Sequence, residues 1–420
     1  MTLTWMKRFS IAFFILNLIL VPTLFYALIV VAEFLGINFT NFLLITAVTL
    51  LLDYSRALGK AIILPIAVLI RKAPILKRRY KVSVVIPAYN EEENIGRCIE
   101  SVLENDYENK QVIVVDDGST DNTYAVASRY RDKVLVLRRP RSGLKAYALN
   151  YGLKFADGDI IVTLDADTVI ARDALERIVA YFQDGKIVAA CGNLRVLNSG
   201  DNILTKLQSY EYIVGFEIGR RLQALFRTLL ILPGAMSIIR KRVVESVGGY
   251  DPMLGEDFDL TLKLHKIRGR LEFLHDVYSW TYAPNSWKAW LRQRLRWHRS
   301  QMRVLIRHRN IFLRRIFGPP GLLGAPDMVL MDFIALVLRP IWILYFMFAY
   351  KWIFVAMILA LLYFITELHT LLAALSLIEY PRDLKYFYAF VLNLIFYRPI
   401  YGLVRLYSYF VEAFNPSYRW

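Results

Sequence analysis

Long apolar stretches are the feature that most constrains this chain, because each is long enough to cross a bilayer as a helix. They run from about residue 10 to 32, 42 to 70, 328 to 349, 352 to 377 and 387 to 410. A membrane span needs about 20 such residues. With 56% hydrophobic residues and a mean hydropathy of +0.37, the 420-residue chain is too apolar for one soluble domain. The sequence therefore predicts a multi-pass protein of the cell membrane.

Basic residues predict the orientation. A cluster of them follows the second apolar stretch: Arg71, Lys72, Lys77, Arg78 and Arg79. Residues 33–41 between the first two stretches contain no Lys or Arg. By the positive-inside rule, the N-terminus and the large middle domain are expected in the cytoplasm. The last stretch is interrupted by Arg398, Pro399 and Arg405, so the side of the C-terminus and the number of spans stay open.

Four regions follow from these features. We expect two transmembrane helices in 1–72, a cytoplasmic domain in 80–283, amphipathic interfacial helices in 284–320, and about three transmembrane or re-entrant helices in 322–414.

The net charge of +16, from 52 Lys and Arg against 36 Asp and Glu, indicates a membrane surface more than nucleic acid. The basic residues flank apolar spans, and no basic stripe interleaved with aromatic residues lies elsewhere. We therefore expect membrane lipid and not nucleic acid as a partner. Cys98 and Cys191 lack a metal-binding spacing and are expected to be buried. No catalytic role is expected for the histidines, which are His265, His275, His298, His308 and His369.

Between residues 81 and 309 the pattern changes to alternating strands and helices. Short β-branched runs VSVVIP, QVIVVD, VLVL, IIVTLD and KIVAACG are separated by helical stretches such as 91–103 and 123–130. This alternation predicts an α/β fold with a mostly parallel, doubly wound sheet, whose ligands bind at the carboxyl ends of the strands. The chain has no GxGxxG motif, which argues against a dinucleotide site.

The run IIVTLDADT, residues 160–168, ends a predicted buried strand in two carboxylates. If the strand continues to the second one, Asp165 and Asp167 point to the same face and can hold a hard cation such as Mg²⁺ or Mn²⁺. Asp also favours loops and helix N-caps, a role that Asp173 could have just beyond, so the motif is weak by itself.

Six motifs in order resemble those of membrane-embedded family-2 glycosyltransferases: VSVVIPAYNEEENI, VVDDGSTDNT, KAYALNYG, LDADT, GEDFDLTLKL and QRLRW. The similarity covers about residues 81 to 299 and is closest to the processive branch of cellulose, chitin, hyaluronan and poly-N-acetylglucosamine synthases. It implies an A-type glycosyltransferase domain inserted between transmembrane helices. The segment Leu232-Pro-Gly-Ala loosely resembles the one that lines the acceptor side in this family.

The resemblance implies a donor site for a UDP-sugar. Its residues would be Pro87, Tyr89, Glu91, Asp117, Lys145, Asp165, Ala166, Asp167, Gln293 and Arg296. The first three would hold the base and ribose, Asp117 would accept from the base, and Lys145 would contact the diphosphate. Asp165 and Asp167 would bind the metal. A simple turn before a helix explains Pro87 to Glu91 as well, and Lys145 could be a solvated helix lysine.

Asp257 is the expected general base, since it matches the family's acidic motif and an acceptor hydroxyl needs a base near the reacting carbon. Glu256 is adjacent, but helical neighbours point about 100° apart, so one of the two is expected to face the pocket. Gln293, Arg296 and Trp297 fall on one helix face, which would offer an arginine to the diphosphate and a ring to the acceptor sugar. A purely interfacial basic helix is the alternative.

The expected function is the inverting transfer of a sugar from a UDP-sugar to a growing polysaccharide at the cytoplasmic face of the membrane. Whether this transfer is coupled to export of the polysaccharide stays open. Two alternatives are a non-processive transferase that adds one sugar to a lipid and, more distantly, a nucleotide-regulated transporter or channel. The intramembrane residues Asp332, Arg339, Glu367 and Arg398 could line a polar path for a glycan, or could pair helices or reach the headgroups.

Overall fold

The computed structural model describes residues 3–70, 74–349 and 352–415, so Arg71 and Lys72 of the predicted basic cluster lie outside the described residues. The chain divides into two compact units. The membrane-helix unit comprises residues 1–72, 213–222 and 326–406, and the sheet unit comprises residues 73–212, 223–325 and 407–420.

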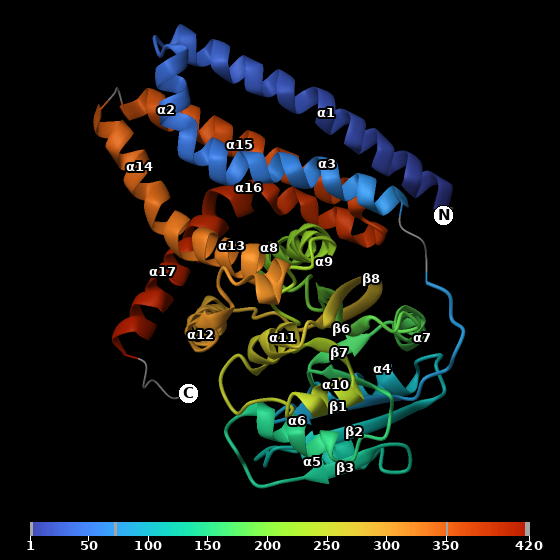
Figure 1. Cartoon of the computed structure of the whole chain (residues 1–420). Coiled ribbons are helices and arrows are strands. Elements are labelled where there is room, and N and C mark those ends of the chain that lie inside the picture. The colour runs from blue at the N-terminus through green and yellow to red at the C-terminus, as the bar shows by residue number, and fades with distance from the viewer. Residues whose placement is uncertain (1–2, 71–73, 350–351, 416–420) are drawn as a thin grey trace. The chain divides into compact units, whose positions relative to one another are not determined.

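An eight-stranded sheet in the order β3-β2-β1-β4-β7-β6-β8-β5 organises the sheet unit (Figure 1). The strands are β1 Val82–Ala88, β2 Lys110–Asp116, β3 Leu135–Arg138, β4 Ile160–Leu164, β5 Thr168–Ile170, β6 Ile187–Val196, β7 Met236–Arg240 and β8 Arg270–Thr281. The pairs β1–β2, β1–β4, β2–β3 and β6–β8 are parallel, and β4–β7, β6–β7 and β5–β8 are antiparallel. The α/β fold class is thereby confirmed, with four parallel pairs among the seven that the structure describes.

Burial explains why the parallel strands are nearly continuous apolar runs. Every residue of β1 and β4 is buried, as expected for strands covered on both faces. The helix α4 buries Ile95, Cys98, Ile99 and Val102, a spacing of three and four residues that makes one apolar face against this core. The helix α4 spans Ile95–Leu103, and the other helices of the unit are α5 Thr123–Ser128, α6 Lys145–Leu153, α7 Ala174–Tyr181, α10 Lys241–Ser246, α11 Glu256–Lys266 and α12 Trp287–Arg307. The helices α8 Ile203–Val214 and α9 Arg221–Leu225 are divided between the two units.

Five helical segments of the described residues are long and apolar enough to cross a membrane: Ile11–Phe34, Phe39–Ala67, Pro320–Ala349, Ile353–Leu377 and Arg382–Phe414. They contain α1 Leu3–Phe34, α2 Phe39–Thr49, α3 Ser55–Ile70, α13 Ala325–Val329, α14 Ala335–Ala349, α15 Trp352–Leu377, α16 Phe390–Leu392 and α17 Arg398–Phe414. In the membrane-helix unit α15 packs against α1 and α3 (Figure 1). Single π-helical turns interrupt several of the helices, at Leu50–Tyr54, Leu330–Ile334 and Asn393–Tyr397.

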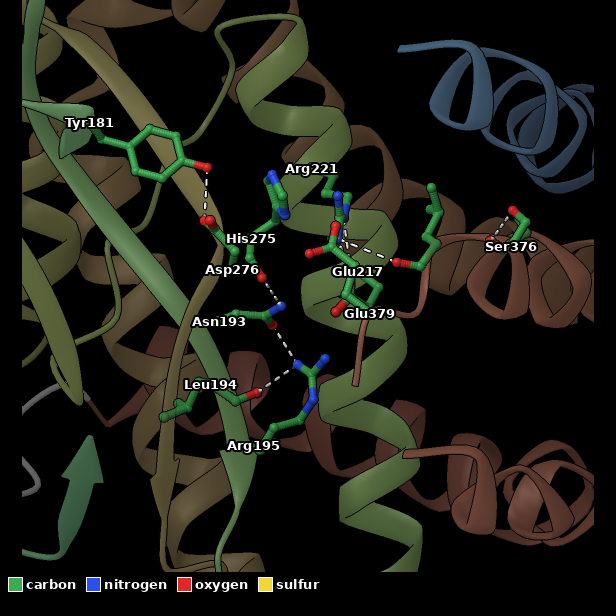
Figure 2. A network of polar contacts seen from close by, with 12 residues as sticks. Tyr181, Asn193, Leu194, Arg195, Glu217, Arg221, His275, Asp276, Ser376 and Glu379 are labelled. Carbon is green, nitrogen blue, oxygen red and sulfur yellow. Dashed lines mark hydrogen bonds and ion pairs between the residues drawn. The ribbon is translucent and has the colours of Figure 1, made fainter. Parts of the chain in front are cut away.

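Some buried polar groups form networks within their own unit (Figure 2). In the sheet unit, the Asn193 amide donates to the His275 carbonyl at 2.7 Å and accepts from Arg195. In the membrane-helix unit, the Arg221 guanidinium pairs with Glu217 at 2.6 Å and with Glu379 at 3.3 Å. Such pairing is expected, because a buried charge without a partner is strongly unfavourable.

Candidate functional site

A tight turn, and not a continued strand, brings the two aspartates together. The strand β4 ends at Leu164, and the Thr168 N–H donates to the Asp165 carbonyl at 3.0 Å, so the chain reverses over Asp165 to Thr168. The condition that the strand continues to the second aspartate is therefore not met. Ala166 between them is buried in the core. The Asp167 Oδ1 atom accepts from the hydroxyls of Thr168 at 3.2 Å and Thr281 at 3.1 Å.

Lys145, at the start of α6, lies at the centre of the site. Its ammonium pairs with Asp165 and approaches the Gly234 carbonyl at 3.4 Å. The Gly234 N–H in turn donates to the Asp257 Oδ2 atom at 3.1 Å. One backbone unit thus touches both Lys145 and Asp257, and a Cβ at Gly234 would lie 2.8 Å from the Lys145 Nζ atom. The structure therefore places the proposed base, the lysine and the first aspartate in one cluster.

The acidic groups of this cluster have shifted pKa values. Burial, reinforced by Asp165 and Glu91, raises the pKa of Asp167 to about 7. Burial also raises the pKa of Asp257, against the opposing effect of Lys145. For Lys145, burial acts to lower the pKa, but nearby carboxylates led by Asp165 outweigh it and raise the pKa above its ordinary value. Such concentration of perturbed groups is typical of functional sites.

The loops after β1 and β2 form a second cluster. The Arg141 guanidinium lies over the Tyr89 ring, 3.4 Å from its centroid, and donates to the Asp117 Oδ2 atom at 2.7 Å. The Ser142 hydroxyl donates to the same carboxylate at 2.8 Å. Pro87 is buried within β1. Tyr89 and Asp117 are thus joined through Arg141, a residue for which the sequence carried no signal.

Glu91 interacts electrostatically with Asp165 and Asp167 of the first cluster. Its backbone N–H donates to the Thr123 hydroxyl at 2.7 Å, and its carboxylate accepts from Asn94 at 2.8 Å. Burial raises the pKa of Glu91, and the charge of Asp165 adds to that effect. The helix α4 begins after Asn94, and Asn90 adopts a φ of 54° in the preceding turn.

The helix α12 contacts the start of α11, beside Asp257. A Cβ at Gly255 would lie 2.9 Å from the Ser300 Cβ atom. Trp297 is 37% exposed, and the Arg294 guanidinium covers its ring at 4.3 Å from the centroid. Arg296 is exposed and Gln293 is partly buried. Neither forms a hydrogen bond or ion pair with Asp165, Asp167 or Asp257 among the residues that the structure describes, so the role of this helix face stays a prediction.

The donor set suits a divalent cation that a substrate helps to bind. No group of three or more His, Cys, Asp and Glu side chains within the described residues could hold a metal alone. Asp165 and Asp167 are nevertheless two hard oxygen ligands on one turn, and Mg²⁺ is commonly held by one or two carboxylates plus substrate phosphates. The residues therefore fit Mg²⁺ or Mn²⁺ bound together with a diphosphate.

The sequence of this chain is similar to those of known glycosyltransferases. Residues 83–248 match the family model described as Glycosyl transferase family 2. The chain is 30% identical over 252 residues to the probable glycosyltransferase YdaM of Bacillus subtilis (strain 168). This match covers 58% of this chain and 59% of that protein. It is 32% identical over 231 residues to the poly-beta-1,6-N-acetyl-D-glucosamine synthase of Staphylococcus aureus (strain COL). This match covers 54% of this chain and 56% of that protein. The chain thus spans somewhat more than half the length of these relatives.

A solved structure has a similar fold. It is the mannosyltransferase PcManGT from Pyrobaculum calidifontis in complex with GDP-Man and Mn²⁺, with a TM-score of 0.61 and 19% sequence identity. The alignment covers 89% of this chain and 100% of that one.

Proposed function

We propose that this chain, which carries a family-2 glycosyltransferase domain over residues 83–248, transfers a sugar from a UDP-sugar to a growing polysaccharide. The family match supports the resemblance and overlaps the first four of the six motifs, while GEDFDLTLKL and QRLRW lie beyond residue 248. The observation that carries the proposal is the cluster of Lys145, Asp165, Gly234 and Asp257. A base, a cation and a metal-binding carboxylate within one cluster are what sugar transfer from a nucleoside diphosphate requires.

In the proposed reaction, Asp257 takes the proton of an acceptor hydroxyl. The hydroxyl oxygen forms a bond to the anomeric carbon on the face opposite the leaving group, and the bond from that carbon to the diphosphate oxygen breaks. The product has inverted configuration, a β-linkage from an α-linked donor. Lys145 lies beside Asp165 and supplies positive charge where the diphosphate leaves.

Asp165 and Asp167 would hold Mg²⁺ or Mn²⁺. When bound, this ion would offset the negative charge of the departing diphosphate. The Mn²⁺ of the similarly folded mannosyltransferase complex supports this choice, although that likeness is one of fold. Tyr89, Glu91 and Asp117 would surround the base and ribose, with Arg141 completing the stack over Tyr89.

The candidate spans support a multi-pass arrangement in the cell membrane, with the sheet unit in the cytoplasm by the positive-inside rule. Trp297 would present its exposed face to the acceptor sugar, and Gln293 and Arg296 would contact the donor. In the alternative, the same site adds one sugar to a lipid. In the membrane-helix unit Arg339 pairs with Asp53 and Arg398 pairs with Glu367, so these charges do not form an open polar path for a polysaccharide. Addition of one sugar to a lipid needs no such path and is therefore kept as the alternative.

A donor screen tests the proposal. The purified full chain is given Mn²⁺ and each of the common UDP-sugars, with GDP-mannose included because of the similarly folded mannosyltransferase. We expect nucleoside diphosphate release with at least one UDP-sugar, and an acceptor-bound ladder on a gel. A single addition would support the lipid acceptor instead. No release with any donor would contradict transferase activity and revive the transporter alternative.

A further inference from the structure

Asn150 of α6 is a motif residue to which the proposed reaction assigns no role. It belongs to the motif KAYALNYG and comes five residues after Lys145. Its side-chain amide bonds both backbone groups of one distant residue: Nδ2 donates to the Tyr250 carbonyl at 2.7 Å, and Oδ1 accepts from the Tyr250 N–H at 2.9 Å. An amide carries a donor and an acceptor side by side, so one asparagine can hold a backbone residue at two points. Asn150 therefore clamps the segment around Tyr250 to α6.

Gly249, next to the clamped residue, makes this close approach possible. A Cβ at Gly249 would lie 2.5 Å from the Asn150 Oδ1 atom, closer than two such atoms can come. Gly249 also has a φ of 73°, in the left-handed region that favours glycine. The backbone before Tyr250 thus has the shape that the amide of Asn150 requires.

The clamp joins the two elements that carry the reacting groups of the proposed cluster. The helix α6 begins at Lys145, and Tyr250 comes seven residues before Asp257 in the chain. Tyr250 is 3% exposed, and burial raises the pKa of its hydroxyl to about 12, with smaller effects from Lys145 and Asp257 among others. The clamped residue therefore lies within electrostatic reach of both groups.

Contacts of Asp251 hold the other side of this segment. Its carboxylate accepts from Lys263 of α11 at 2.8 Å and also from Arg307 of α12. The segment is therefore attached to α11 without Asn150, so loss of the clamp should loosen its attachment to α6 while the fold stays intact. Asn150 is partly exposed, which agrees with a contact whose loss the sheet unit can tolerate.

We infer that Asn150 is a positioning residue that fixes the distance between Lys145 and Asp257. This inference rests on the proposed function, in which Asp257 is the base and Lys145 lies where the diphosphate leaves. The two groups also meet at Gly234, whose carbonyl is 3.4 Å from Lys145 and whose N–H is 3.1 Å from Asp257. The two bonds of Asn150 are shorter, at 2.7 and 2.9 Å. A displacement of about 1 Å between reacting groups can cost about 10²-fold in rate, so Asn150 affects transfer through the place of Asp257.

Asn150→Asp tests this role, because it keeps the side-chain shape and the acceptor but loses the donor to the Tyr250 carbonyl. The full chain is assayed with Mn²⁺ and the UDP-sugar that the donor screen identifies, and active sites are counted by UDP binding on the same preparation. We expect kcat per site to fall by about 10- to 100-fold, with the Kd of UDP within about twofold of wild type. Asn150→Ala, which removes both bonds, should show the same pattern, and Asn310→Asp at an exposed position should behave as wild type. Unchanged kcat in both Asn150 variants, or a loss that lies mainly in UDP affinity, would overturn the inference.

A double variant separates positioning of the base from general loosening of the site. Asp257→Asn already lacks the base, and residues that act as a unit have non-additive effects. Adding Asn150→Asp to Asp257→Asn should therefore lower the residual rate by less than about threefold. A further loss as large as that of Asn150→Asp alone would identify Asn150 as a structural residue and contradict the inference. Absence of transfer in the wild-type chain would instead remove the proposed function, and this inference would fall with it.

Discussion

At the scale of single residues, main-chain amides orient one of two adjacent acids, Asp257 and Glu256. Asp257 accepts from the Gly234 N–H through Oδ2 and from the Phe258 N–H through Oδ1 at 2.8 Å. Glu256 forms no side-chain hydrogen bond to another residue that the structure describes. Gly255, with a φ of 82°, lets α11 begin at this point. The orientation of Asp257 therefore depends on the loop between α9 and β7, which contains Gly234, and on the start of α11.

The raised pKa of Glu256 predicts a pH dependence of stability. Burial, with Asp257 as the next cause, raises the pKa of Glu256 from 4.5 to about 7. Between these values the folded chain binds more protons than the unfolded chain, so the free energy of unfolding falls as pH rises. The thermal unfolding midpoint should therefore decrease from about pH 4.5 to 7, and Glu256→Gln should flatten that decrease. An unchanged slope would contradict the burial of this carboxyl group.

Thr281 should set the metal affinity, since it orients Asp167. Its hydroxyl and that of Thr168 both bond Oδ1, which leaves Oδ2 for a cation. Loss of a group that orients a metal ligand typically lowers metal affinity by about 10- to 100-fold. We expect Thr281→Val to weaken Mn²⁺ binding by about tenfold, measured by electron paramagnetic resonance with nucleotide present. Thr281→Ser, which keeps the hydroxyl, should bind as wild type, and equal losses in both variants would show that the hydroxyl is not involved.

At the scale of elements, α12 has a polar buried face. Its buried residues include Arg294, His298 and Arg299, and the first of these pairs with Glu211 at 2.7 Å. A helix that only lies in a membrane interface would bury its apolar side. The buried arginines instead fix α12 within the sheet unit, and Ser300 contacts the start of α11. The proposed acceptor residue Trp297 is thereby held on a rigid element.

Glu412 should be critical for this element. Its buried carboxylate accepts from Arg299 at 2.8 Å and also from Arg303. Removing one member of a buried ion pair typically destabilises by about 3–5 kcal/mol. Glu412→Gln should therefore lower the thermal unfolding midpoint clearly. The control is Glu245→Gln at an exposed pair with Lys241, 3.8 Å long, where about 0–1 kcal/mol is expected; similar midpoints for both variants would contradict the role of Glu412.

Periodicity identified some elements and missed others for a physical reason. Runs such as those of β1, β2 and β4 are apolar and β-branched because they are buried in the parallel part of the sheet. The strands β5, β7 and β8 were not predicted. β5 has three residues, and β8 mixes charged and aromatic residues that only its pairing with β6 and β5 stabilises. Antiparallel pairing between segments distant in sequence leaves no local pattern.

At the scale of the whole molecule, the candidate site also combines residues that a local motif predicts with residues that no motif predicts. The motifs predict Asp165, Asp167, Lys145 and Asp257, and the sheet order explains how β4, β7 and α6 bring their ends together. The partners that orient those groups carry no motif: Gly234 acts through its backbone, Thr281 through the β5–β8 pairing, and Arg141 through a loop. The five candidate spans of the described residues agree with the number of apolar stretches.

The most direct test of one catalytic cluster is acceptor-dependent transfer by Asp257→Asn at saturating donor and Mn²⁺, with nucleotide binding measured on the same preparation. A general base typically contributes about 10²- to 10⁴-fold, so we expect a loss of that size in transfer with donor affinity unchanged. Glu256→Gln, the matched neighbour, should lose far less. Near-normal transfer by Asp257→Asn, or a larger loss in Glu256→Gln, would contradict the account.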